Sequence, residues 1–287
     1  MTQPTIRRAL WACRMPLLSA SLLVFSLACQ VPETSGMKTK DEHSIIEAVP
    51  TSAVVADEGL PGSWFPLSSL APAARAFEVG PQEDESVRGG LLLIPPWWGV
   101  NPAIRNVARA FAEKGYRVVV PDLYEGVVST SPLSAELLLR GVEAKRAESI
   151  LDAALAHLEK TAGANAASVL GVGAGGGAAL ETARRHDGLR LVVVDTATAM
   201  LSPENAEGIK APLLLVVGAE SAAFHADRLD AIAADLERLG VDFSYRRIML
   251  SGNVLLDDHA PGYSVIAAEE AIDAIAEAIE QQRSEGS

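Results

Sequence analysis

Cysteine is scarce in this sequence, and its placement limits the available chemistry. The 287 residues include two cysteines, Cys13 and Cys29, both near the N-terminus. The rest of the chain therefore contains no disulfide, no thiol nucleophile and no cysteine metal site. An apolar run of about 20 residues, the length that spans a bilayer, is also missing. These absences exclude a disulfide-stabilised domain and a membrane-spanning protein.

Positive charge is also in short supply. The sequence has 24 Lys and Arg residues against 37 Asp and Glu residues, a net charge of −13. Arg7, Arg8 and Arg14 lie in residues 1–29, which contain no acid, so the remainder has 21 basic and 37 acidic residues and a charge of −16. An acidic surface repels phosphate groups. We therefore expect neither nucleic acid nor anionic lipid as a partner of the folded part.

The first 29 residues have the pattern of an export signal. The three arginines precede the short apolar run Met15–Ala28, which leads directly to Cys29. A basic segment, a short apolar run and a small residue at its end are typical of a cleaved signal peptide. The small residue before the cysteine resembles a bacterial lipoprotein signal, in which Cys29 is lipidated. We predict a lipoprotein of the cell envelope, periplasmic or at the outer surface, with a secreted soluble protein as the alternative.

Residues 30–62 are polar and show no helical or strand period. They include Pro32, Pro50 and Pro61 together with serine, threonine and several charges. This composition is typical of a flexible tether. The predicted folded domain is therefore 63–287.

The domain sequence alternates apolar runs with amphipathic segments. Asn101 and Pro102 have the types that favour an N-cap and a first helical residue. Strands are predicted for 90–95, 117–121, 167–172, 189–195, 211–217 and 241–250. Helices are predicted for 102–114, 135–161, 229–236 and 272–279, and a further helix is predicted to follow the glycine-rich turn 173–177 and to end at 185. Regular alternation predicts a three-layer αβα sandwich around a mostly parallel sheet.

Several motifs in the first half of this domain occur together in one order. They are Pro95-Pro96-Trp97-Trp98-Gly99-Val100-Asn101-Pro102, then Ile104-Arg105, Gly115-Tyr116 and Val119-Val120-Pro121-Asp122-Leu123-Tyr124. In order and spacing this segment resembles the dienelactone hydrolase family of the α/β-hydrolase superfamily. The resemblance implies hydrolysis of an ester or lactone. A cysteine or serine on a sharp strand-to-helix turn would be the nucleophile, with a histidine base and an orienting aspartate.

The positions that correspond to the family's catalytic groups carry other residues. The nucleophile position falls on Gly173, or on Gly175 if the frame is shifted by two residues. The acid position falls on Ser221, next to Glu220, and the histidine position falls on Val254. The His-Glu pair that opens the family's strand motif is replaced by Pro95-Pro96. Because every change removes a functional group, we expect a hydrolase fold whose catalysis is degenerate.

Part of the site is independent of the lost side chains. The resemblance places the oxyanion-binding N–H groups on Trp97 and Ala174, with Trp98 as a further ligand-binding candidate. Backbone N–H groups at a helix N-terminus favour negative charge. We therefore expect a small carbonyl or carboxylate ligand, with no cofactor and no metal ion.

Two other functions are open at this point. Gly171-x-Gly173-x-x-Gly176, followed by Asp195, has the spacing of a dinucleotide-binding fingerprint. Alternatively, the protein is an active carboxylic-ester hydrolase whose catalytic triad has been relocated. The candidate triad residues are Ser221 or Ser251, His259, and Asp257 or Asp258, although we expect the charges of 257–259 to be solvated. The other histidines, His157, His186 and His225, are interpreted as surface helix residues.

Overall fold

The computed structural model describes residues 60–67, 74–81, 86–162, 167–195, 201–220, 226–249, 251–252 and 254–285. The predicted signal peptide with Cys29, and all but the last three residues of the predicted tether, lie outside these ranges. Ser221 and His225 lie outside them as well. Within the described ranges, every helix is too short or too polar to cross a bilayer.

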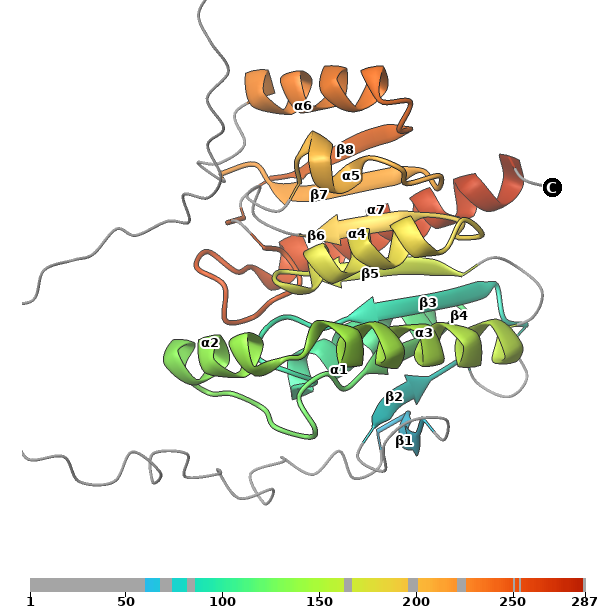
Figure 1. The fold of residues 1–287 in the computed structure, drawn as a ribbon, viewed down its shortest axis with the longest axis vertical. Coiled ribbons are helices and arrows are strands. Elements are labelled where there is room, and N and C mark those ends of the chain that lie inside the picture. Colours follow the sequence, from blue (N-terminus) through green and yellow to red (C-terminus); the bar gives the residue numbers. More distant parts are fainter. Residues whose placement is uncertain are drawn as a thin grey trace, which may run out of the picture. The chain divides into compact units, whose positions relative to one another are not determined.

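The centre of the domain is one sheet in the order β1-β2-β4-β3-β5-β6-β7-β8 (Figure 1). Its strands are β1 Ser63–Pro66, β2 Arg75–Val79, β3 Gly89–Ile94, β4 Tyr116–Pro121, β5 Ser168–Val172, β6 Val192–Asp195, β7 Leu213–Gly218 and β8 Phe243–Ile248. Strands β1 and β2 are antiparallel to their neighbours, and the strands from β4 to β8 run parallel. The predicted mostly parallel sheet is confirmed.

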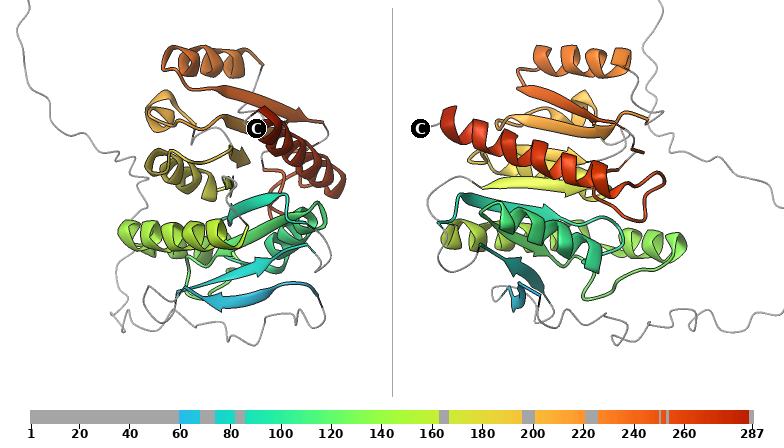
Figure 2. Two further views of the ribbon diagram at one scale, coloured as in Figure 1. Left: turned by 90° about the vertical axis from the view of Figure 1, so that its right-hand side faces the viewer. Right: turned by 180° about the vertical axis from the view of Figure 1, so that it is seen from behind.

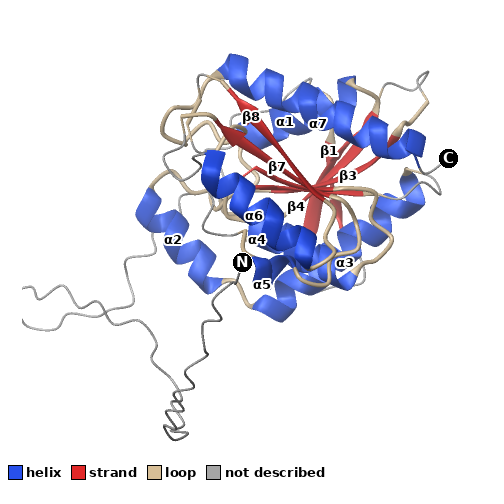
Figure 3. Ribbon diagram, turned by 90° about the horizontal axis from the view of Figure 1, so that it is seen from above, coloured by secondary structure: helices blue, strands red, loops and turns tan. Residues whose placement is uncertain are grey.

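Helices cover both faces of the sheet, which gives the predicted three layers (Figures 2 and 3). The helices are α1 Pro102–Glu113, α2 Pro132–Gly141, α3 Ala144–Thr161, α4 Gly175–Arg185, α5 Pro203–Ala206, α6 Ala226–Arg238 and α7 Val265–Glu285. Helices α1 and α7 pack on one face, and α3, α4 and α6 pack on the other.

The central strands are apolar along their whole length because both of their faces are covered. In β3, Leu92 and Ile94 contact the layer of α3 and α4, whereas Leu91 and Leu93 contact the layer of α1 and α7. Side chains alternate across a strand, so one uninterrupted run supplies both cores. Each such fully buried side chain contributes about 1.5–3 kcal/mol.

The observed helix boundaries agree with those predicted from the sequence at α1 and differ from them in the segment that was predicted as 135–161. The Asn101 side chain accepts a hydrogen bond from the N–H of Ile104 at 2.9 Å, as an N-cap does. The single helix predicted for 135–161 is wrong, because the chain forms α2 and α3 instead. Val142, with φ −72° and ψ 118°, is extended and interrupts the helix. Strands β1 and β2 and the short α5 were not predicted.

Candidate functional site

A sharp corner joins β5 to α4 at Gly173. Gly173 has φ +54°, a conformation that strains any side chain. A Cβ at Gly171 would lie 2.4 Å from the carbonyl oxygen of Gly175. A Cβ at Gly175 would lie 2.6 Å from the carbonyl oxygen of Ile94. The backbone therefore has the shape of a nucleophile elbow centred on Gly173, and the frame centred on Gly175 is excluded.

The elbow has room for the side chain that the sequence omits. A Cβ at Gly173 would meet one atom within 4 Å, the Cβ of Pro96 at 3.6 Å, which is ordinary van der Waals contact. Glycine at this position is therefore not required by crowding. The corner presents backbone N–H groups and no nucleophilic side chain.

The fully buried Asp195, at the end of β6, connects the elbow to the loop that follows β8. Its carbonyl oxygen accepts the N–H of Gly173 at 2.7 Å. Its carboxylate accepts the N–H groups of Leu255 at 2.8 Å and of Leu256 at 2.7 Å. Burial raises the pKa of Asp195 to about 7, although these hydrogen bonds oppose the shift. This carboxylate is used inside the fold, which argues against a ribose-binding role and so against the dinucleotide reading.

The residues at the expected base and acid positions supply no proton-transfer group among those described. Val254 is half-buried and packs against the core beneath α1 and α7. Ser221 lies outside the described residues, and its neighbour Glu220 is exposed. Ser251 is buried, and its hydroxyl donates to the carbonyl oxygen of Ile248 at 3.2 Å. Ser251 is therefore not paired with His259, as the relocated triad would need.

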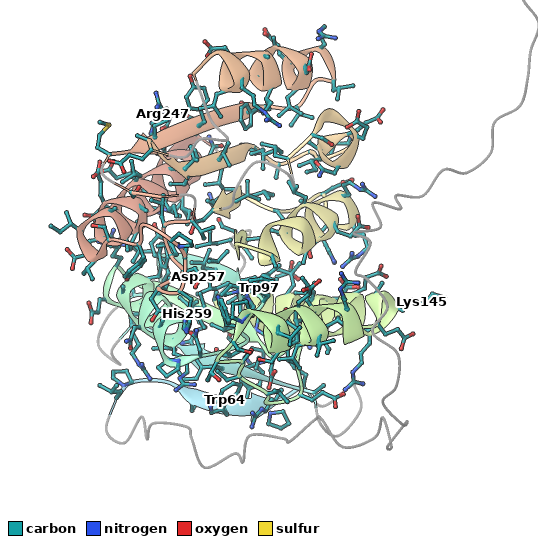
Figure 4. The ribbon with its side chains drawn as sticks, turned by 90° about the vertical axis from the view of Figure 1, so that its left-hand side faces the viewer. Trp64, Trp97, Lys145, Arg247, Asp257 and His259 are labelled. Atoms are coloured by element: carbon teal, nitrogen blue, oxygen red, sulfur yellow. The ribbon has the colours of Figure 1, made fainter. Side chains whose placement is uncertain are left out.

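A cluster of aromatic and acidic side chains lies beside the elbow. The indole N–H of Trp98 donates to Asp257 Oδ2 at 2.9 Å, and both groups are buried. The His259 ring stacks on Trp98, with 4.6 Å between ring centroids, and pairs through Nδ1 with Asp258 Oδ1 at 2.7 Å. Figure 4 shows Trp97, Asp257 and His259 close together near the middle of this face.

This cluster corrects the expectation that the charges of residues 257–259 are all solvated. Asp257 is buried, and its Oδ1 also accepts the backbone N–H of His259 at 3.0 Å, whereas Asp258 and His259 are exposed. Desolvation raises the pKa of Asp257, against the hydrogen bonds that lower it. Trp98 was the residue from which the burial of an acceptor such as Asp257 could have been predicted, because a buried indole N–H needs a hydrogen-bond acceptor.

Two N–H groups and one ring remain for a ligand. Trp97 is half-buried and meets Trp98 edge-on, with 5.2 Å between centroids. Ala174 is the N-cap of α4, and no side chain caps this helix end. Trp98 is buried and uses its indole in the fold, which leaves Trp97 and Ala174 as the accessible candidates.

Among the described residues, the histidines outside the elbow each lie beside a carboxylate. His157 pairs with Glu78 at 3.2 Å, and His186 pairs with Asp152 at 2.9 Å. Asp257, Asp258 and His259 each offer one ligand atom, and these atoms lie within 4.8 Å of one another. Both oxygens of Asp257 accept hydrogen bonds within the fold, and nothing beyond the proximity of these atoms points to an ion.

Several solved structures with a similar fold have the names of hydrolases. A protein from Klebsiella pneumoniae subsp. pneumoniae MGH 78578, provisionally named a dienelactone hydrolase, has a TM-score of 0.65 and 17% identity, over 77% of this chain and 98% of its own. A dienelactone hydrolase-like promiscuous phosphotriesterase from metagenomic libraries has a TM-score of 0.62 and 18% identity, over 77% of this chain and 97% of its own. An α/β-hydrolase from a Medee basin deep-sea metagenome has a TM-score of 0.53 and 13% identity, over 77% and 97% of the two chains.

Sequence comparison identifies the family directly. A search of curated proteins found no match. A model of the dienelactone hydrolase family matches residues 75–282, from the start of β2 into α7. With the elbow at Gly173 and this strand order, the chain belongs to the dienelactone hydrolase family of α/β-hydrolases.

Proposed function

We propose that this protein is a catalytically degenerate dienelactone hydrolase that binds a small carbonyl or carboxylate compound at its elbow. The observation that carries the proposal is Gly173, which has elbow geometry and no side chain. A coupled nucleophile and base provide many orders of magnitude in rate, and what remains without them is binding and oxyanion stabilisation. Such a site retains ligands without cleaving them.

The binding half of the proposal rests on backbone groups. The N-terminus of α4 carries partial positive charge and has no side-chain cap. The N–H of Ala174 belongs to this helix end, and the family resemblance adds the N–H of Trp97. A Cβ at the nucleophile position would have one neighbour within 4 Å, the Cβ of Pro96, and we infer that a ligand oxygen can lie there beside these donors.

Calorimetric titration with a dienelactone tests the proposal. We expect saturable heat without turnover in the wild-type protein. Gly173→Leu should abolish binding, because its side chain fills the space next to Pro96. Gly240→Leu is the matched control, since Gly240 also has positive φ, at +73°, but faces open space. Equal binding by both variants, or no binding by the wild type, would contradict the proposal.

An active hydrolase with a relocated base is the second candidate. It is favoured by one observation, the pairing of His259 with Asp258 beside Trp98. Such a pair orients an imidazole as a general base. The described serine Ser251 is occupied by the carbonyl of Ile248, so an attacking group would have to be water or Ser221. Loss of ester turnover in His259→Ala would support this candidate.

We further propose that the protein is an exported lipoprotein of the cell envelope, anchored through Cys29. Support comes from the sequence, in which three arginines precede a short apolar run that ends at Cys29. The acidic domain offers no attraction to anionic lipid, so acyl chains on Cys29 would supply the membrane affinity. The alternative is secretion as a soluble protein.

A further inference from the structure

A pocket lies at the same edge of the sheet, and no residue of the elbow lines it. It is a cavity of about 230 Å³. Its lining residues are Trp64, Arg75, Val100, Arg105, Asp122, Gly126, Val127 and Val128. They come from β1, β2 and α1 and from the loops that follow β3 and β4, where open α/β sheets bind ligands. We propose that this cavity binds a small carboxylate with an apolar body, held by Arg75.

The guanidinium of Arg75 is fixed by its surroundings. Its Nε donates to Asp122 Oδ2 at 3.0 Å, and its Cζ lies 4.2 Å from the centroid of the Trp64 ring. The guanidinium lies close to Gly126, where a Cβ would be only 2.6 Å from the Nη2 of Arg75. Asp122 is itself held, because its Oδ1 accepts the N–H of Tyr124 at 3.1 Å. The guanidinium is therefore preorganised before any ligand arrives.

The bond to Asp122 uses one nitrogen of this guanidinium. Within the described part of the chain, the hydrogen bonds of Arg75 use Nε alone, so Nη1 and Nη2 retain their donors. The side chain is 39% exposed, so a ligand can reach it. Two parallel N–H donors match the two oxygens of a carboxylate. Asp122 accepts two N–H donors already and does not compete for this edge.

The remaining walls select the body of the ligand. Val100, Val127 and Val128 are apolar, and the Trp64 ring closes one side. Apolar walls with a few converging polar groups are typical of small-molecule sites. At about 230 Å³ the cavity is smaller than the 300–1,000 Å³ of drug-sized pockets, so the ligand is small. Inorganic phosphate would meet Arg75 but would leave the apolar walls without contact.

This pocket is separate from the elbow in its residues and its chemistry. Arg105, the second cation in its wall, is buried and donates to the carbonyl oxygen of Val100 at 3.0 Å. The inference uses neither Gly173 nor the N–H groups of Trp97 and Ala174, so it stands or falls independently of the proposed elbow site.

Titration of 4-fluorobenzoate, followed by fluorine NMR and calorimetry, tests the inference on the purified chain. We expect saturable binding to the wild type, with at least tenfold weaker binding to Arg75→Gln. Arg146→Gln is the matched control, because it also removes an arginine from a carboxylate pair, with Glu125, outside the cavity. Inorganic phosphate should compete poorly. Gly173→Leu should remove any binding of fluorobenzoate at the elbow and leave the binding that depends on Arg75 unchanged, which separates the two sites.

A second pair of variants covers the case in which Arg75→Gln fails to fold. Val127 lies at the rim and is 47% exposed, so polar replacements there are tolerated. Val127→Glu places a carboxylate near Arg75 and should abolish binding, whereas the isosteric Val127→Gln should retain most of it. The inference is overturned if the wild type shows no saturable binding, or if the Glu and Gln variants bind equally.

Discussion

The carbonyl oxygen of Asp195 accepts the N–H of Gly173 at 2.7 Å, while the Asp195 carboxylate accepts the N–H groups of two residues in the loop after β8. One buried residue thus joins the elbow to the loop that contains Val254 and the Asp257–His259 turn. Asp195 thereby holds together the segments that carry Gly173 and Val254, the positions that correspond to the family's nucleophile and base.

The buried carboxylate of Asp195 should make stability depend on pH. Its pKa is about 7 in the folded protein and about 3.9 when unfolded. The folded state therefore binds the proton more tightly than the unfolded state does. The resulting stabilisation of the folded state is complete below about pH 4 and is lost as pH rises to about 7. The loss is at most about 4 kcal/mol, at about 1.4 kcal/mol per pKa unit.

Asp195→Asn isolates this contribution. Urea unfolding at pH 5 and at pH 8.5 should show that the wild type loses stability relative to the variant as pH rises. Asp257 is present in both proteins, and its charge helps to raise the pKa of Asp195, so the difference reports Asp195 together with that coupling. A stability difference that is the same at both pH values would refute a raised pKa at Asp195.

Replacing Gly173 by serine should cost stability without restoring hydrolysis. The strain of a side chain at φ +54° predicts a loss of about 1–3 kcal/mol, because the surrounding space is open. Gly240→Ser is the matched control, since it has positive φ and lies far from the elbow in sequence. Both variants should lose similar stability in denaturant unfolding. A much larger loss at Gly173 would mean that the corner is more crowded than its contacts indicate.

The contact between Trp98 and Asp257 should stabilise the fold. Trp98→Phe removes the indole donor and leaves the buried Oδ2 of Asp257 without this hydrogen bond. The expected loss in the free energy of unfolding is about 1–3 kcal/mol. Trp97→Phe should cost less, because Trp97 is half-buried and its indole makes no such bond among the described residues. Thermal unfolding of the two variants gives the comparison, and equal losses would count against the role given to this hydrogen bond.

The proposed anchor gives a cellular prediction. Cys29→Ser should release the protein from the membrane fraction and leave its folded domain unchanged, because acyl chains on Cys29 supply the membrane affinity. Fractionation with immunoblotting measures the distribution. If the wild-type protein is already in the soluble fraction, export as a soluble protein is correct instead.

Much of the fold was predictable because its central strands are continuous apolar runs bounded by turn residues. Strand β2, Arg75–Val79, was missed because charged residues interrupt its pattern, and its pairing with β4 is what defines it. The division of α2 from α3 depends on the extended Val142, whose type does not forbid helix.

The site was predictable at the elbow and not around it. The family resemblance placed the corner at Gly173 or Gly175, and the positive φ of Gly173 decides between them. The burial of Asp257 depends on Trp98, which is 159 residues away, and the role of Asp195 depends on N–H groups 60 residues away. Contacts of that separation leave no local pattern.

The most direct test of the account is the hydrolysis of activated esters and of a dienelactone by the purified chain, followed to single-turnover sensitivity. With glycine at the nucleophile position and valine at the base position, the protein should give no burst and no turnover above buffer. Mass spectrometry should find no acylated protein. Saturable turnover that is abolished in His259→Ala would contradict the account and establish a working hydrolase with a relocated base.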